Sequence, residues 1–376
     1  MVYFDYNATT PVIPAARQAW LDATEQFPGN PSSQHRIGTR TDHSLNEARD
    51  WLADYLGCTA DSLIWTSGAT EANNMVLHHA LSILPPDAEV WISAIEHPCV
   101  MQSTLRYFPQ RHRLIPVFPS GIVDLDWVSH ELADKRPGLV AVMAANNETG
   151  ILQPWREIQV MCQQYQVPFF CDAVQWIGKL PPEGLGQCDY LSGCAHKFGG
   201  PKGIGFLKCP SGKPLKPLLV GGPQEEGRRA GTENVAGVLS MMAALRERAK
   251  LIAAGEHENR LRMRHAFETK LLHKLDGCRL TGGNVPRLWN TVSAIMPQTD
   301  CRVRWVVKMD KLGYAVSTGS ACSSGKEEPS HVLSALGLLP WEAGRVLRFS
   351  GGWETTEELW EDLLEGLLKA RTLMES

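Results

Sequence analysis

Several common features are missing from this sequence. No apolar run approaches the roughly 20 residues that a helix needs to cross a bilayer. The first residues, MVYFDYNATTPV, lack the basic-then-apolar layout of a signal peptide. The net charge is −4 over 376 residues, so there is no basic excess of the kind that binds nucleic acid. No internal repeat or low-complexity segment is present. We therefore expect a globular protein that contacts neither a membrane nor nucleic acid directly.

The ten cysteines show no CxxC or other metal-ligand spacing, so we expect neither a metal site nor a disulfide scaffold. Thiols scattered through a chain without a secretion signal fit a reducing cytoplasm. Most are predicted to be inert core residues, such as Cys171 in the apolar run VPFFCDAV. Cys322 is different, because the segment STGSACSSGKEEPS (317–330) surrounds it with small polar residues that cannot bury it. Cys322 is either an incidental loop thiol, or a thiol that must be accessible to other molecules and must move.

The pattern of apolar runs predicts a doubly wound α/β fold. A hydrophobic content of 43% in a chain of this length is enough for one large domain and a smaller one. Helical stretches such as 41–57 and 155–166 alternate with short apolar runs, several of them continuous, as in strands buried on both faces. This alternation favours a mainly parallel sheet. The predicted strands are 63–67, 89–95, 139–145, 167–174 and 203–209.

Beyond about residue 250 the pattern changes to longer helices and shorter strands. The last of these helices, TTEELWEDLLEGLLKARTLM, has a predicted capping box made by Thr355 and Glu358. We predict a large domain over residues 14–250. Residues 1–13 and 251–376 would form a smaller α+β domain that carries the Cys322 loop.

Polar residues follow one predicted strand after another. In open α/β sheets ligands bind beyond the carboxyl ends of the strands, so these residues are candidates for one site. Gly68, Ala69 and Thr70 begin a helix, where free N–H groups and the helix dipole favour a phosphate. A carboxylate buried at a strand end needs a cationic partner. The remaining candidates are His97, Asn147, Asp172, Gln175 and Lys197.

Taken together, these parts match the needs of pyridoxal 5′-phosphate. A lysine amine can form a Schiff base with it, and a buried acid can keep its ring nitrogen protonated, so that the ring acts as an electron sink. An aromatic side chain can stack on the ring, and a helix start can hold the phosphate. Any one of these residues alone would more simply be structural.

The sequence also resembles a known family. The strings DYNATTPV, GNPSSQH, TSGATEANN, IEHPCV, NNETG, DAVQWIGKLP, HKFGGPKGIGFL, RRAGTENV, STGSACSS, EPSHVL and LRFS occur in this order. Together they are similar to the class I (NifS/IscS-like) cysteine desulfurases within the class-V aminotransferase family. The match spans about residues 2–370. It implies the fold of the pyridoxal phosphate-dependent transferases (aspartate aminotransferase-like, fold type I).

The resemblance also implies residue roles. Lys197 would hold the cofactor, His97 would stack on its ring and assist proton transfers, and Asp172 would pair with the ring nitrogen. Residues implied to contact the ring oxygen or the phosphate are Asn147, Gln175, Ala69, Thr70, Cys194 and His196. Thr232 would reach the phosphate from a partner subunit, which implies a homodimer. Residues implied on the substrate side are Arg348, for the substrate carboxylate, with Asn7, Asn30 and Asn147.

Cys322 corresponds to the nucleophile that takes sulfur from the substrate as a persulfide. The implied reaction converts L-cysteine to L-alanine, and the sulfur then passes to an acceptor protein. The thiol must be deprotonated to attack and must move to deliver its sulfur. The long segment up to EPSHVL is typical of class I. Acceptors could serve iron–sulfur assembly, tRNA thiolation or DNA phosphorothioation.

The sequence departs from the family pattern at several points. Cys194 stands where relatives have a serine that binds the phosphate, and a thiol is a weaker donor than a hydroxyl. Proline and glutamate replace glycine and arginine in GGPQEEGRRAGT. Gly352 and Trp353 follow LRFS where LGR is common, which could alter the substrate pocket or its mouth. The chain stops 28 residues after Arg348, short of the tail that docks an iron–sulfur scaffold in relatives, which favours a specialised acceptor.

Three other interpretations remain. A selenocysteine or cystine C–S lyase would depend less on Cys322. A catalytically poor regulatory homologue would keep the fold, although the presence of Lys197 argues against it. A nucleotide-binding α/β protein would need a glycine fingerprint such as GxxxxGK[ST], which the sequence lacks.

Overall fold

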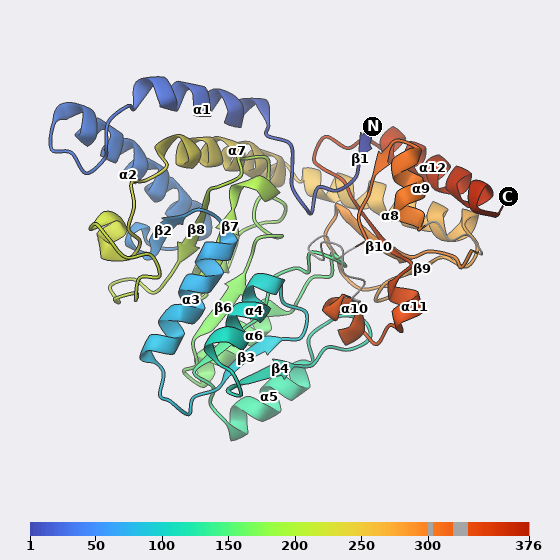
Figure 1. Cartoon of the computed structure of the whole chain (residues 1–376), viewed down its shortest axis with the longest axis horizontal. Helices are drawn as coiled ribbons and strands as arrows, with labels where there is room; N and C mark the ends of the chain where they lie inside the picture. Colours follow the sequence, from blue (N-terminus) through green and yellow to red (C-terminus); the bar gives the residue numbers. More distant parts are fainter. Residues whose placement is uncertain (300–303, 319–329, 376) are drawn as a thin grey trace.

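Figure 1 shows a computed structural model, which describes residues 1–299, 304–318 and 330–375. Its larger part is built on a seven-stranded sheet of order β2-β8-β7-β6-β5-β3-β4. Only β8 runs antiparallel to its neighbours, β2 and β7. The prediction of a mainly parallel sheet is therefore confirmed. The strands are β2 (Leu63–Thr66), β3 (Val90–Ser93), β4 (His112–Ile115), β5 (Leu139–Ala141), β6 (Phe169–Asp172), β7 (Tyr190–Cys194) and β8 (Gly205–Lys208).

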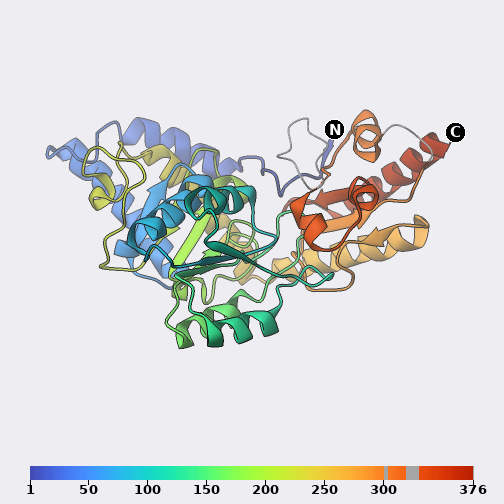
Figure 2. The same ribbon diagram turned by 60° about the horizontal axis from the view of Figure 1, so that its bottom comes forward.

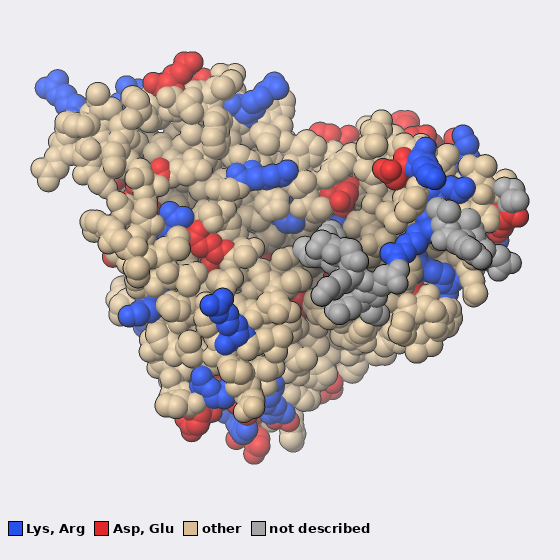
Figure 3. All heavy atoms as spheres, viewed as in Figure 1, with Lys and Arg blue, Asp and Glu red and all other residues tan. Residues whose placement is uncertain are grey.

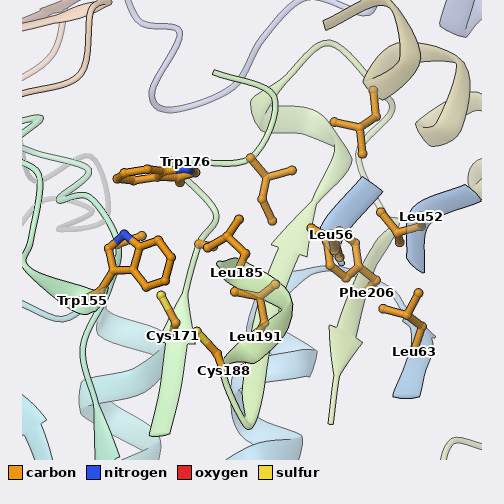
Figure 4. Packing of buried hydrophobic residues seen from close by; sticks show 14 of the residues in the cluster. Leu52, Leu56, Leu63, Trp155, Cys171, Trp176, Leu185, Cys188, Leu191 and Phe206 are labelled. Atoms are coloured by element: carbon orange, nitrogen blue, oxygen red, sulfur yellow. The ribbon is translucent and has the colours of Figure 1, made fainter. Parts of the chain in front are cut away.

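Helices cover both faces of this sheet, as the continuous apolar runs predict. Alternate residues of the inner strands enter two different cores: Trp91 and Val140 join one, whereas Ile92 and Ala141 join the other. Figure 4 shows part of the first core, in which Trp155 and Trp176 pack beside Cys171 and Cys188. The helices are α1 (Pro14–Gln26), α2 (Arg36–Leu56), α3 (Ala69–Ile83), α4 (Pro98–Tyr107), α5 (Leu125–Asp134), α6 (Trp155–Gln164) and α7 (Val235–Ala253).

The smaller part has its own core, formed mainly by the C-terminal third of the chain. Phe4 from the N-terminal segment also packs there, with its ring 4.7 Å from that of Trp360. Figure 2 shows the N-terminal segment beside the C-terminal helices. The predicted domain limits at residues 14 and 250 stay predictions. Elements here are β1 (Val2–Tyr3), α8 (Glu256–Lys274), β9 (Arg279–Leu280), β10 (Thr291–Ile295), α9 (Trp305–Lys311), β11 (Tyr314–Ala315), α10 (His331–Ala335), α11 (Pro340–Ala343), β12 (Val346–Ser350) and α12 (Glu357–Glu375).

Two predicted helix starts were wrong. The helix predicted from residue 41 begins at Arg36, because His35 caps it by accepting from the Gly38 N–H group. The predicted N-cap of the last helix is displaced by one residue, and with it Leu359 takes the place that Glu358 has in the predicted capping box. The Thr355 hydroxyl accepts from the Gly352 N–H group instead, and Thr356 accepts from the N–H group of Leu359.

On the face shown in Figure 3, basic and acidic side chains are interspersed. Among the described helices, none combines the length and apolar character that crossing a bilayer requires. Within the same described ranges, no cluster of three or more His, Cys, Asp or Glu residues is arranged to hold a metal ion.

Candidate active site

A cavity of about 850 Å³ lies at the carboxyl ends of the parallel strands. Its walls come from the turns after β2, β3, β5, β6 and β7, from the N-terminal segment, and from Ser330, His331 and Arg348 of the smaller part. Because β8 is antiparallel, its beginning reaches this same edge and brings Lys202 and Gly203 to the wall. The cavity therefore lies where open α/β sheets bind ligands.

All but three of the residues predicted for the site line this cavity. Asn30 and Thr232 are exposed and lie outside it. Asn30 belongs to the loop between α1 and α2, where its side chain accepts from the Ser32 N–H group. Cys322 lies outside the described residues. The predicted residues that do line the cavity are Asn7, Ala69, Thr70, His97, Asn147, Asp172, Gln175, Cys194, His196, Lys197 and Arg348.

One wall is the N-terminal end of α3. This helix starts immediately after Gly68, whose φ of 153° favours glycine and whose position offers no side-chain cap. The N–H groups of the first turn have no acceptor inside the helix, so this end attracts anions. Burial raises the pKa of the Cys194 thiol to about 11 and lowers that of the His196 imidazole to about 4. Both side chains are therefore neutral hydrogen-bonding groups at this wall.

Lys197 follows β7 and extends its amine into the cavity. The Nζ atom donates to the carbonyl oxygens of Asn7 and Ala8 at 2.6 and 2.8 Å. Burial lowers the pKa of this amine, and the positive charge of Arg348 lowers it further, although Cys194 and Asp172 oppose the shift. A lowered pKa increases the fraction of neutral, nucleophilic amine.

Asp172 and His97 complete the central part of the cavity. Asp172 is the last residue of β6, and its carboxylate accepts from Asn73 Nδ2 at 2.8 Å and from the Val174 N–H group at 3.0 Å. His97 caps α4 by accepting from the N–H group of Cys99. Burial lowers the pKa of the His97 imidazole, while the Asp172 carboxylate acts in the opposite direction. A ligand cation would give the buried carboxylate the partner that the sequence led us to expect.

Arg348 has fewer free donors than the sequence suggests. Its Nη1 donates to the carbonyl of Asn147 at 2.8 Å, and its Nη2 pairs with the Asp5 carboxylate at 2.6 Å. The Nε atom is buried and has no partner among the described residues. The guanidinium is thus held at the cavity wall by Asp5 and the Asn147 carbonyl.

Two buried acids beside the cavity were not predicted. Glu96 is 1% exposed and accepts from the Ser93 hydroxyl at 2.6 Å and from the Met143 N–H group at 2.8 Å. Glu148 lines the cavity and accepts from the hydroxyl of Ser330 at 2.6 Å. Burial raises the pKa of both carboxyl groups, that of Glu96 to about 8. Glu96 belongs to the motif IEHPCV and Glu148 to the motif NNETG. Their place in these motifs is the sequence signal by which the two acids could have been found.

The raised pKa of Glu96 predicts that the protein loses stability as the pH rises. Below about pH 4.5 the carboxyl is protonated in both states. As the pH rises from 4.5 toward 8, the unfolded chain releases this proton while the folded chain keeps it. The free energy of unfolding should fall by up to about 5 kcal/mol over this range, at about 1.4 kcal/mol per pKa unit.

Urea denaturation at pH 5 and 8.5 measures this effect. The variant Glu96→Gln, which keeps an acceptor but cannot ionise, should lose less stability than wild type between the two pH values. Glu47→Gln, on an exposed position of α2, is the control and should behave as wild type. Equal pH dependence in wild type and Glu96→Gln would show that Glu96 does not titrate in this way.

A buried lysine, Lys179, supports the floor of the cavity and also escaped prediction. It is 3% exposed, and its amine donates to Gln175 Oε1 at 2.5 Å and to Asn7 Oδ1 at 3.1 Å. Gln175 in turn donates to the carbonyl of Asn7. Burial lowers the pKa of Lys179 strongly, and the charge of Lys197 adds to this. The Lys179 amine therefore holds the side chains of Asn7 and Gln175, two predicted site residues, in place by donating to their neutral amide oxygens.

Gly352 and Trp353 do not line the large cavity. Instead they border a much smaller space behind Lys197. Trp353 is 6% exposed, packs on Trp289 and donates to the carbonyl of Gly178 at 3.0 Å. A Cβ atom on Gly352 would lie 2.2 Å from the Tyr6 ring. The departure from LGR is thus a packing feature behind the lysine, and its effect on the pocket or its mouth stays a prediction.

Comparisons with known proteins cover nearly the whole chain. The family model described as Aminotransferase class-V matches residues 2–362. A cysteine desulfurase IscS of Dictyoglomus turgidum is 37% identical over 381 aligned positions, and the alignment covers 99% of this chain and 96% of that relative. A solved structure of a NifS-like protein has a TM-score of 0.88 at 30% identity and covers 99% of both chains. SspA in complex with cysteine has a TM-score of 0.78 at 27% identity, over 93% of this chain and 98% of that one.

Proposed function

The chain belongs to the class-V aminotransferase family, and on that premise we propose that it is a cysteine desulfurase that makes L-alanine from L-cysteine. The observation that carries this proposal is the meeting of four groups around one cavity. They are an amine with a lowered pKa, a buried carboxylate, an imidazole and an uncapped helix start. The relatives named cysteine desulfurase match this chain over almost its full length.

Enzymes of this family use pyridoxal 5′-phosphate, and the residues present fit that group. The uncapped end of α3 suits its phosphate, with Cys194 and His196 as neutral neighbours. Lys197 would hold the cofactor through its amine, Asp172 would face the ring nitrogen, and Asn147 and Gln175 the ring oxygen. When bound, the cofactor supplies an electron sink that weakens the bonds around the substrate α-carbon.

The chain's own residues would bind and orient the substrate. Arg348 would place its guanidinium beside the substrate carboxylate, and Asp5 keeps the guanidinium in place. His97 lies beside Lys197 and Asp172, where an imidazole can carry protons. Glu148 and His331 add hydrogen-bonding groups to the wall nearest Arg348.

Sulfur transfer is assigned to Cys322, which lies outside the described residues. The residues on either side of its segment support this role. Ser317 pairs with Arg348 through two backbone hydrogen bonds of 2.7 and 3.2 Å, and Ser330 lines the cavity. The thiolate attacks the substrate sulfur, the C–S bond breaks, and the freed carbon takes a proton. L-cysteine and the Cys322 thiol thereby become L-alanine and a Cys322 persulfide, with no other oxidant needed.

A second copy of the chain would complete the site. Thr232 is exposed and lies outside its own cavity, which is consistent with the family role of reaching the cavity of a second copy. The loop that leads to it is held rigidly, because Glu225 adopts a φ of 48° and pairs with Arg49 at 2.9 Å. Val220 of the same loop is 81% exposed, which suits an apolar contact with a partner. The persulfide would then pass from this homodimer to an acceptor protein.

The function is tested by incubating the cofactor-loaded protein with L-cysteine and a thiol reductant. Alanine and sulfide should form in equal amounts, because the reductant releases sulfide from the persulfide. Pyruvate and ammonia in place of alanine would contradict the proposal. Turnover of selenocysteine or cystine, but not of cysteine, would favour the lyase interpretation instead.

Replacing Cys194 with serine should strengthen cofactor binding. A hydroxyl is the better donor to a phosphate, so the dissociation constant should fall by about 2- to 10-fold, as one modest hydrogen bond allows. Absorbance titration of the cofactor-free protein measures it. The control is Cys209→Ser, a buried cysteine outside the cavity, which should leave the constant unchanged. Weaker binding by Cys194→Ser would show that the thiol does not face the phosphate.

A further inference from the structure

A continuous chain of hydrogen bonds links Asp172 to His97 through two residues to which the family resemblance assigns no role. Asn73 of α3 donates from Nδ2 to Asp172 Oδ2 at 2.8 Å, and the same Nδ2 lies 3.1 Å from Cys99 Sγ. Cys99 Sγ lies 2.9 Å from His97 Nδ1. The chain thus passes from β6 to α3 and from α3 to α4.

The chemistry of these groups fixes the direction of each bond. The carboxylate of Asp172 can only accept when ionised, so the Asn73 amide must present its NH₂ group there. The second N–H of that group can donate to the sulfur, which leaves the Cys99 S–H to donate to His97 Nδ1, whose lone pair it shares with the backbone N–H group of Cys99. Asn73 Oδ1 is buried and has no partner among the described residues, and reversing the amide would place that oxygen against the carboxylate.

The backbone of Cys99 supports the same assignment. Its N–H group also points at His97 Nδ1, at 3.2 Å. A backbone N–H can only donate, so Nδ1 must be the acceptor and carries no proton. In the neutral imidazole the proton is then on Nε2, which is left for the cavity.

We propose that Asn73 and Cys99 are positioning residues that hold His97 as a neutral imidazole with its proton on Nε2, and that tie its orientation to Asp172. The proposal rests on the desulfurase function, because it concerns the histidine assigned to proton transfer there. The proposed arrangement gives Cys99, the cysteine of the IEHPCV motif, a role that is separate from sulfur transfer.

Several charged or titratable groups face the imidazole. Asp172 from β6 favours the imidazolium, whereas Lys197 after β7 and His331 of α10 disfavour it. Cys99 is the neighbour on α4 itself, and burial raises the pKa of its thiol, so the thiol keeps its proton. Removing the S–H donor makes Nδ1 more basic. The pKa of His97 should therefore rise.

The test is nitrogen NMR of protein labelled with ¹⁵N-histidine, with and without cofactor. The His97 signals are identified by comparison with His97→Gln. In wild type, Nε2 should carry the proton and Nδ1 should not. In Cys99→Ala the pKa of His97 should rise by about half a unit to one unit, as expected for one lost hydrogen bond. Cys99→Ser should restore the wild-type value, and Asn73→Ala should give a smaller rise than Cys99→Ala.

The matched control is Cys58→Ala, a half-buried cysteine far from the cavity, which should leave the His97 signals unchanged. In active protein, the acidic limb of the kcat/KM profile should move with the His97 pKa. A wild-type proton on Nδ1, or a His97 pKa that is the same in Cys99→Ala, would overturn the proposal. Because the NMR spectra need no turnover, failure of the desulfurase function would be seen separately as a lack of alanine.

Discussion

Lys197→Ala is expected to abolish desulfurase turnover and the yellow colour of the protein. The amine donates only to the carbonyls of Asn7 and Ala8, so the fold should tolerate its loss. Without it, the cofactor loses the amine that follows β7, since Lys179 is committed to Gln175 and Asn7 behind the wall and Lys202 is an exposed residue just before β8. Turnover should fall about 10⁴-fold or more, which corresponds to at least about 5.5 kcal/mol of activation free energy.

The control for Lys197 is Lys208→Met. Lys208 is 8% exposed in β8 of the same sheet and does not line the cavity. Its loss should cost stability but leave the colour and the turnover per folded molecule unchanged. Alanine production is the readout, with absorbance as a separate measure of bound cofactor. A coloured Lys197→Ala protein that retains a tenth of the wild-type rate would contradict the role given to this residue.

Arg348→Lys is expected to raise the KM for cysteine roughly 100-fold with a much smaller change in kcat. A guanidinium offers several donors in a fixed plane, which an ammonium group cannot reproduce, and a charge-assisted hydrogen bond contributes about 1.5–3 kcal/mol. Asp5 and the Asn147 carbonyl hold the guanidinium in place, so the lysine would also leave these partners poorly satisfied.

Comparing L-cysteine with its methyl ester isolates the carboxylate contact. Wild type should prefer the acid strongly, and Arg348→Lys should lose most of that preference. Arg287→Lys is the control, because Arg287 is 5% exposed and lies outside the cavity. It should affect stability but not substrate preference. A preference that survives in Arg348→Lys would show that another group binds the carboxylate.

Much of the fold could be predicted because one physical signal dominated it. Strands buried on both faces give continuous apolar runs, and the structure shows alternate residues, such as Trp91 and Ile92, in cores on opposite faces. The start of α2 was missed because it depends on a histidine cap at His35 rather than on the usual serine, threonine or aspartate.

The site residues at the ends of strands could be predicted from the sequence, whereas the residues that pack behind them could not. Asp172 ends a strand, and Lys197 and His97 each follow one, so their positions along the chain bring all three to one edge of the sheet. Asn73 and Cys99 are different, because Asn73 lies one turn inside α3, Cys99 is the second residue of α4, and the two meet only when these helices pack together. Their contact depends on side-chain directions, which the spacing of residues along the sequence does not give. The same holds for Lys179, which reaches Asn7 across 172 residues.

The most direct test of the account compares alanine formation by wild type and Cys322→Ala, both loaded with cofactor and matched by absorbance. The account predicts that the variant keeps its colour and makes almost no alanine from L-cysteine. Mass spectrometry of wild type, without reductant, should find one extra sulfur on the peptide that contains Cys322. If the variant makes alanine as fast as wild type, Cys322 does not accept the sulfur and the persulfide mechanism is wrong.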